Sequence, residues 1–260
     1  MEFCTLASGS SGNAILIRSE TTAILVDAGI SAKRLTESLA SRGISPSDLS
    51  AILITHEHSD HIGGLPVFMK KCPSCVLASF GTSAHLNVAS SPFEVGDAFS
   101  IGDLDIQTFP TSHDAAESVG YRIDCGGASL GILTDTGFVT EQANMCLLGV
   151  DALILEANYD TEMLQNGPYP AMLKRRIASR HGHLSNKDAA AFALASVKKG
   201  TSDILLAHLS AENNTPDAAA YTVGRSLQAK GHCVRLSVAP RSTVSEVHIC
   251  KKSLSFVSEN

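Results

Sequence analysis

Short apolar segments recur along the whole chain, and turns or helical segments separate them. They are rich in β-branched and aliphatic residues and are bounded by Gly, Ser, Asp or Pro, which is typical of β-strands. The pattern predicts strands at residues 2–6, 14–18, 23–27, 51–54, 76–78, 98–101, 104–109, 121–124, 129–134, 152–156, 204–207 and 234–238.

Helical segments are interleaved with these strands. The pattern predicts helices at residues 31–42, 140–148, 170–180, 186–199 and 216–230. Strands and helices do not alternate regularly enough for a doubly wound sheet, so we expect an α/β (α+β) sandwich of two sheets with helices outside. No linker interrupts the chain, so residues 1–260 are expected to form a single domain.

The composition excludes several classes of protein. Hydrophobic residues make up 44% of the chain and charged residues 18%, which excludes a disordered protein. Twenty basic against 26 acidic residues give a net charge of −6, which argues against coating nucleic acid or membranes by bulk charge. The sequence shows no signal peptide and no apolar run of transmembrane length, so no membrane partner is expected. Seven scattered cysteines fit free thiols, and we expect a cytoplasmic protein.

The strongest chemical signal is the segment ILITHEHSDHIGGL at residues 52–65. Three imidazoles and a carboxylate follow an apolar strand within six residues, and they suit two adjacent divalent metals. Alternate residues of an extended loop project to the same side, so His56 and His58 are expected to share one metal. Asp60 and His61 can then turn to the second.

One loop cannot complete two metal sites, so further ligands are expected downstream. Three residues that can serve as ligands come after predicted apolar strands, as His56 does: His113, Asp135 and His208. A carboxylate is a natural bridge between two cations, which favours Asp135 for that position. Imidazole and carboxylate ligands suit zinc, manganese or iron, and the sequence does not choose among them.

The ordered set of ligands resembles that of the metallo-β-lactamase superfamily, and the resemblance spans most of the chain. The similarity is closer to the YycJ/WalJ-like branch. It rests on the segments LASGSSGN (6–13), TSHD (111–114), TDTG (134–137), LEANYD (155–160), GPYP (167–170), GHLSN (182–186) and HLSAENNTP (208–216).

The resemblance implies a four-layer αβ/βα sandwich with two divalent metals at the mouth between its sheets. It also implies phosphodiester hydrolysis, specifically 5′→3′ exonuclease action on double-stranded DNA. We expect a hydroxide bridging the metals to attack phosphorus, with Asp60 helping to orient it. No protein partner can be deduced from the sequence.

His183 opens a polar segment before a predicted helix. The other histidines and aspartates already supply both metals, so His183 is free to donate a proton to the leaving oxygen or to hold a phosphate oxygen. It resembles the non-ligand histidine of the tRNA 3′-processing nucleases of the superfamily. The alternative is a helix-start residue that only bonds the backbone.

Several weaker features allow two interpretations. The Gly- and Ser-rich turn at residues 8–13 can cradle a phosphate or can simply be a tight turn. The basic stretch at residues 174–176, with Arg180 and Lys187, can grip DNA phosphates or form a solvated helix face. Tyr169 can stack on a base or can pack within its turn.

Two further pairs of residues are candidates for a role in the protein. Glu156 and Asn158 end a predicted strand and are candidates for supporting the ligands. Cys72 and Cys75 form a single C-x-x-C, which without a second pair predicts two ordinary thiols.

Two other functions fit the same residues. The first is hydrolysis of a small-molecule thioester, lactone or phosphodiester, since these reactions use the same ligands. The second is a non-catalytic, metal-stabilised interaction protein, although purely structural metal sites are usually closed and four-coordinate. A flavin-linked di-iron reductase is less favoured, because that branch typically carries Glu where His58 stands.

Overall fold

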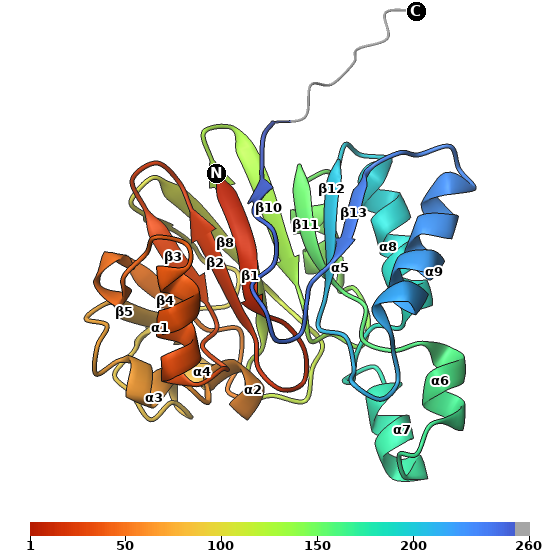
Figure 1. The fold of residues 1–260 in the computed structure, drawn as a ribbon, viewed down its shortest axis with the longest axis horizontal. Coiled ribbons are helices and arrows are strands. Elements are labelled where there is room, and N and C mark those ends of the chain that lie inside the picture. Colours follow the sequence, from red (N-terminus) through yellow and green to blue (C-terminus); the bar gives the residue numbers. More distant parts are fainter. Residues whose placement is uncertain (253–260) are drawn as a thin grey trace, which may run out of the picture.

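Two seven-stranded sheets pack face to face, and helices cover their outer surfaces (Figure 1). The structure is a computed structural model that describes residues 1–252. No helix in this part of the chain is both long and apolar enough to cross a membrane.

The first sheet has the strand order β14-β1-β2-β3-β4-β5-β6. Its strands are β1 (Glu2–Ala7), β2 (Ala14–Arg18), β3 (Ala23–Val26), β4 (Ala51–Leu53), β5 (Cys75–Ser79), β6 (Ser91–Phe93) and β14 (His248–Ile249). Pairing is antiparallel from β14 to β3 and parallel from β3 to β6. Its connections contain α1 (Ala32–Ala40), η1 (Pro46–Asp48), α2 (Ser59–Ile62), α3 (Leu65–Phe68) and α4 (Phe80–Ser83).

The second sheet repeats this plan in the order β13-β12-β11-β10-β9-β8-β7. Its strands are β7 (Ala98–Ile101), β8 (Leu104–Pro110), β9 (Val119–Cys125), β10 (Ala128–Leu133), β11 (Ala152–Glu156), β12 (Asp203–Ala207) and β13 (Arg235–Val238). Pairing is antiparallel from β7 to β10 and parallel from β10 to β13. The accompanying helices are α5 (Glu141–Leu147), α6 (Thr161–Asn166), α7 (Ala171–Ile177), α8 (Asn186–Val197) and α9 (Pro216–Gln228).

The apolar residues of each central strand divide between two cores. In β3, Ile24 and Val26 face the space between the sheets, whereas Leu25 packs toward α1. In β11, Ile154 faces the other sheet, and Leu155 packs toward α8 and α9. Successive strand residues point to opposite faces, so strands that are apolar on both faces must be covered on both sides. The predicted four-layer αβ/βα sandwich is confirmed.

Side-chain caps begin two of the longer helices. Ser31 precedes α1, and its Oγ accepts a hydrogen bond from the Arg34 amide at 3.4 Å. Ser185 precedes α8 and accepts from the Asp188 amide at 3.1 Å. These bonds satisfy amide groups that have no partner inside the helix.

The short elements differ from the prediction. Residues 56–61 are not a fully extended loop, because α2 begins at Ser59, directly after His58. The sequence pattern also missed β6, β14, α2, α3, α4 and α6. Each is too short to show a hydrophobic period, and β6 contains Pro92, which is tolerated because the strand lies at a sheet edge.

His248 lies in β14, at the edge of the first sheet, and its side chain contacts the second sheet. Its Nδ1 lies 2.8 Å from Oδ2 of Asp203 in β12, and its ring stacks on Phe3 with centroids 4.9 Å apart. Nε2 lies 3.4 Å from the Ser237 hydroxyl of β13. The side chain of His248 is buried, so these contacts are shielded from water.

We expect His248→Ala to lower the free energy of unfolding by about 3 kcal/mol, because it removes a buried partner of a carboxylate. Urea unfolding followed by circular dichroism measures the change. His232→Ala is the matched control, with an expected change within about 0.5 kcal/mol. Equal urea midpoints for the two variants would show that His248 does not tie the sheets together.

Candidate metal centre

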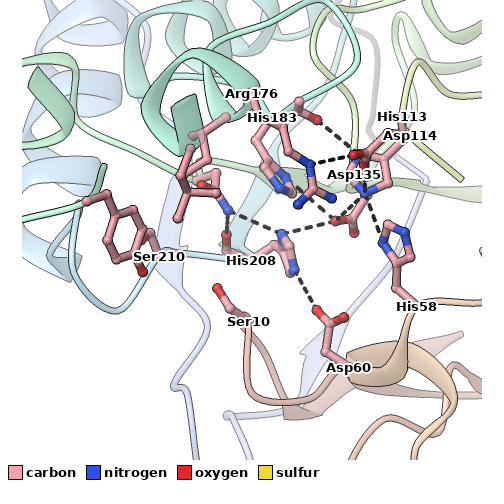
Figure 2. A pocket seen from close by; sticks show the side chains of 15 residues that line it. Ser10, His58, Asp60, His113, Asp114, Asp135, Arg176, His183, His208 and Ser210 are labelled. Atoms are coloured by element: carbon pink, nitrogen blue, oxygen red, sulfur yellow. Dashed lines mark hydrogen bonds and ion pairs between the residues drawn. The ribbon is translucent and has the colours of Figure 1, made fainter. Parts of the chain in front are cut away.

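The candidate site lies where polar residues follow the ends of buried strands. These residues and the β1–β2 turn line an open pocket of about 210 Å³ (Figure 2). The lining includes His58, Asp60, His113, Asp135, His183 and His208. Most of the residues singled out from the sequence therefore meet in one place, although 150 positions separate His58 from His208 along the chain.

Three residues within two positions of a strand end hold left-handed backbone conformations that are rare for residues other than glycine. They are Asp27, Asp135 and His208, with φ values of 63°, 53° and 56°. Such conformations cost free energy and persist where the surrounding structure enforces them. All three side chains belong to the candidate site, so the strained backbone turns them into the space between the sheets.

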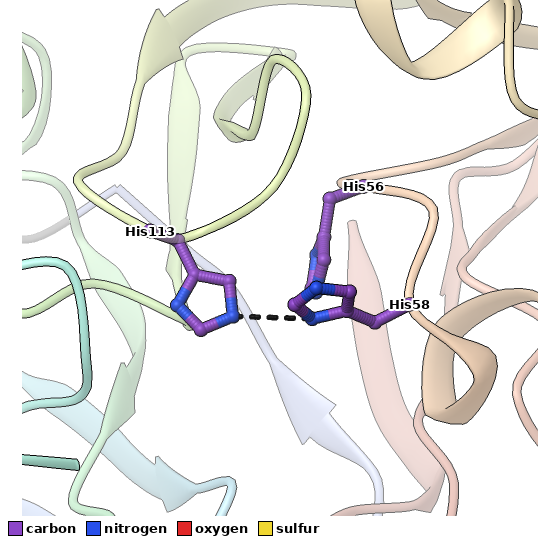
Figure 3. A group of neighbouring side chains, drawn as sticks. All are labelled: His56, His58 and His113. Atoms are coloured by element: carbon purple, nitrogen blue, oxygen red, sulfur yellow. Dashed lines mark hydrogen bonds between the residues drawn. The ribbon is translucent and has the colours of Figure 1, made fainter. Parts of the chain in front are cut away.

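The first group of candidate ligands is His56, His58 and His113 (Figure 3). Nδ1 of His58 lies 3.3 Å from Nε2 of His113. Nε2 of His56 is buried and has no hydrogen-bond partner among residues 1–252. Three nitrogens that converge in this way, one of them without a partner, fit a divalent cation.

The second group is Asp60, His61 and His208. Nε2 of His61 and Nε2 of His208 lie 3.4 Å and 3.5 Å from Oδ2 of Asp60. The two imidazoles are buried, whereas the Asp60 side chain is 23% exposed and faces the pocket. This set again has the chemistry of a divalent-cation site.

Asp135 lies between the two groups. Its Oδ2 lies 3.3 Å from Nε2 of His61, and its Oδ1 lies 3.8 Å from Nε2 of His113. Oδ2 is buried without a hydrogen bond in the described part of the chain. A buried carboxylate oxygen needs a compensating charge, so the two groups and Asp135 together fit divalent cations.

Four of the five candidate ligand imidazoles are oriented by a partner at Nδ1. Nδ1 of His61 lies 2.7 Å from Oδ2 of Asp27, and Nδ1 of His56 lies 3.1 Å from the Thr55 hydroxyl. Two more contacts complete the set: Nδ1 of His113 with the Gly182 carbonyl at 3.0 Å and Nδ1 of His208 with Glu156 at 3.0 Å. Such partners fix the tautomer and direct the remaining nitrogen at a metal.

The protonation of the imidazoles follows their surroundings. Burial and the nearby rings of His61 and His113 hold the pKa of His56 well below its usual value, so this ring is neutral. Burial alone would lower the pKa of His61, but the Asp27 and Asp135 carboxylates raise it to about 10. Burial opposes ionisation of Asp60, yet hydrogen bonds from His208 and His61 hold its pKa below the usual value.

Glu156 contacts histidines of the candidate site and is completely buried. Its Oε1 accepts from Nδ1 of His183 at 2.7 Å, and its Oε2 accepts from the Thr136 amide at 3.0 Å. Asn158 Nδ2 donates to the His208 carbonyl at 2.9 Å. The two residues therefore lie where the sequence suggested, in contact with the candidate ligands.

His183 reaches the pocket, and its side chain is more exposed than those of His61, His113 and His208. Its Nδ1, which lies 3.6 Å from Oδ1 of Asp135, already donates to Glu156. Burial lowers the pKa of His183, but the Glu156 carboxylate outweighs burial and raises it. His183 also joins Asp135, Glu156 and His208 in another group whose candidate ligand atoms converge.

The side chains of the basic stretch lie in different environments. Arg176 lines the pocket, whereas Lys174 donates to the Gln165 carbonyl at 2.8 Å. The Arg180 guanidinium lies 3.9 Å from the centre of the Phe138 ring. The side chains of the stretch therefore have different neighbours, and among the described residues Arg176 is the member that lines the pocket.

The turn at residues 8–13 braces the site. The Ser8 hydroxyl accepts from the His208 amide at 2.8 Å, and Ser10 and Tyr169 line the pocket. Away from the site, Cys72 is buried, Cys75 is exposed and both are free. Ordinary thiols at these two positions are confirmed.

The sequence pattern missed three supporting residues: Asp27, Thr55 and Asn13. Asp27 accepts from the Thr55 amide at 2.9 Å as well as contacting His61. Asn13 Nδ2 lies 3.0 Å from Nε2 of His61. Asp27 follows an apolar strand as Asp135 does, and this shared feature is the signal that points to it.

The comparisons with known proteins agree with this geometry. The family described as "Beta-lactamase superfamily domain" matches residues 22–208. The chain is 38% identical to exodeoxyribonuclease YycJ of Bacillus anthracis over 239 residues, covering 89% of this chain and 90% of that protein. It is 40% identical to exodeoxyribonuclease WalJ of Streptococcus pneumoniae D39 over 236 residues, covering 87% and 88%.

The fold also matches solved structures. The metallo-β-lactamase fold protein YhfI of Bacillus subtilis superposes with a TM-score of 0.75 at 16% identity and covers 94% of this chain and 98% of that one. The family match and the two relatives show the family of this chain, and the fold agrees with them. The chain belongs to the metallo-β-lactamase superfamily, in the branch that contains the YycJ and WalJ exodeoxyribonucleases.

Proposed function

We propose that this protein is a phosphodiester hydrolase that uses two divalent metal ions and degrades double-stranded DNA as a 5′→3′ exonuclease. The observation that carries the chemistry is the pair of ligand groups on either side of Asp135. The names of the YycJ and WalJ relatives, which match over almost their whole length, support DNA as the substrate.

Zinc or manganese suits the proposed ligands, and iron is a third possibility. His56, His58 and His113 would hold one ion, Asp60, His61 and His208 the other, and Asp135 would bridge them. When bound, the ions would lower the pKa of water and offset charge on the phosphate.

Asp60 is assigned to orient the attacking water. Its carboxylate is the most exposed member of the group Asp60, His61 and His208. Nδ2 of Asn13 and Nε2 of His208 lie 3.4 Å and 3.5 Å from its Oδ2. Because its pKa lies below the usual value, Asp60 is ionised and can accept a hydrogen bond from water at neutral pH.

His183 is assigned to protonate the departing 3′ oxygen. Glu156 fixes its Nδ1–H and raises its pKa against burial, so the second nitrogen can carry a proton into the pocket. A proton donor at this position removes the need to expel an alkoxide.

The chain is further proposed to act as one domain. Its candidate ligands come from both halves: His56 follows β4 of the first sheet, and His208 follows β12 of the second. A separated half would lack at least one ligand of each proposed ion.

A linear duplex labelled differently at its 5′ and 3′ ends tests the function. Metal-free protein is reloaded separately with zinc or manganese, and early release of the 5′ label is expected. Asp60→Ala, checked for folding by circular dichroism, should reduce the rate by at least about 100-fold. If protein shown to hold two ions cleaves no DNA, a small-molecule ester becomes the better substrate. Early release of the 3′ label would reverse the proposed direction.

His183→Ala is expected to lower kcat on DNA by about 10²–10⁴-fold. Since a proton donor works below its pKa, wild-type activity should fall as the pH rises through the raised pKa of His183, and the variant should lack that decline. A nitrophenyl phosphodiester, whose leaving group departs without a proton, should be hydrolysed by the variant at nearly the wild-type rate. Equal losses on both substrates would contradict the assignment.

Asp27→Asn should weaken cation binding by about 10–100-fold while preserving the left-handed backbone, which Asn tolerates. In the metal-free protein His61 is protonated below about pH 10, so cation binding must release that proton and must tighten as the pH rises. Calorimetry at pH 7.5 in buffers of different ionisation enthalpy measures both effects. The variant should release fewer protons, whereas the exposed control Asp103→Asn should match the wild type. Unchanged proton release in Asp27→Asn would refute the role of Asp27.

A further inference from the structure

Arg176 is the one lysine or arginine among the residues that line the pocket in the described part of the chain. The same lining contains three carboxylates, those of Asp60, Asp114 and Asp135. A phosphodiester carries a negative charge, so carboxylates repel it and an arginine attracts it. The guanidinium is also permanently charged and matches the geometry of phosphate oxygens.

Asp114 holds the guanidinium by one edge only. Nε of Arg176 donates to Oδ2 of Asp114 at 2.6 Å, and the two side chains meet at the side of the pocket that also holds His183 (Figure 2). The two terminal nitrogens of Arg176 make no hydrogen bond within residues 1–252. The part of the guanidinium that can bind two phosphate oxygens is therefore free, while its direction is constrained.

The backbone around Arg176 is fixed against the candidate site. The His183 amide donates to the Ile177 carbonyl at 2.9 Å. A Cβ on Gly182 would lie only 2.3 Å from the Arg176 carbonyl oxygen, so a residue without a side chain is needed at this contact. The end of α7 and the segment that carries His183 are thus locked together, and His113 bonds the same Gly182.

We propose that Arg176 binds a non-bridging oxygen of the phosphate that is hydrolysed, and that Asp114 is a positioning residue that aims its guanidinium. This inference rests on the proposed phosphodiesterase function. It selects one residue from the basic stretch: Lys174 is bonded to a carbonyl, Arg180 lies on Phe138, and Arg175 and Lys187 are not among the residues that line the pocket.

Two substrates separate the reacting phosphate from the others. The nitrophenyl ester of thymidine 5′-phosphate contains a single phosphodiester, whereas the labelled duplex contains many. Arg176→Ala should lower kcat/KM by about 10–100-fold on both substrates, and Arg176→Lys should lose less because it keeps the charge. Arg175→Ala, the neighbouring control on the same helix, should stay within about twofold. A loss confined to the duplex would place Arg176 on a different phosphate and overturn the assignment.

Binding of inorganic phosphate tests Arg176 independently of turnover. Calorimetry on the metal-loaded protein should show about tenfold weaker phosphate binding in Arg176→Ala, with metal content unchanged and with Arg175→Ala like the wild type. If the wild type hydrolyses neither substrate, the proposed function fails, yet this measurement still decides whether Arg176 binds phosphate. Unchanged phosphate affinity in Arg176→Ala would overturn the inference.

A double-mutant cycle tests Asp114. Oδ1 of Asp114 also lies 3.5 Å from Nε2 of His113, so its removal can act through either neighbour. If Asp114 positions Arg176, Asp114→Asn should lower kcat/KM in the wild type by about 3–10-fold but by less than twofold in Arg176→Ala. An equal loss in both backgrounds would show that Asp114 does not act through Arg176.

Discussion

The buried carboxylate of Asp135 is the constraint on which the rest of the site depends. It lies where the two sheets meet, and its Oδ2 has no hydrogen bond among residues 1–252. An uncompensated charge there would be strongly unfavourable, so positive charge must be supplied nearby. The surrounding imidazoles have nitrogens directed at the same space, one of them, Nε2 of His56, without a partner. Cations that bind these nitrogens would satisfy both requirements; in the metal-free site the protonated His61, whose pKa Asp135 helps to raise, supplies positive charge 3.3 Å from Oδ2.

The sandwich provides rigid supports on both sides of that carboxylate. His56 follows a strand of one sheet, whereas Asp135 and His208 follow strands of the other. The left-handed conformations of Asp135 and His208 are unfavourable in isolation, and the packed strands before them enforce these conformations. The strained backbone and the buried carboxylate of the candidate site are each unfavourable by themselves. The well-packed layers around the site stabilise both.

Much of this arrangement could be predicted from the sequence because its signals are local. Apolar strands with covered faces and a dense histidine motif each occupy a few consecutive residues, and they were sufficient for the layers and for most of the side chains that meet at the candidate site. The contact between Asp27 and His61 was not predictable in this way, since the two are separated by 34 positions and Asp27 alone resembles an ordinary turn residue. The start of α2 at Ser59 was missed because four residues show no helical period. The division of the basic stretch also depends on how α7 packs, which the order of residues does not reveal.

The packing of α7 gives the pocket its asymmetry. Asp60 and the β1–β2 turn form one side, rich in oxygen atoms, whereas Arg176 and His183 come from a single segment on the other side. Under the proposed function, a phosphodiester between these sides would meet the Asp60 carboxylate at one face, the Arg176 guanidinium at a non-bridging oxygen and the His183 imidazole near its leaving group. Since in-line displacement requires the nucleophile and the leaving group on opposite sides of phosphorus, this polarity suits phosphoryl chemistry better than a symmetric ring of ligands would. Under the proposed function, the candidate metal ligands would account for activation, and the segment around α7 would account for the orientation of the substrate.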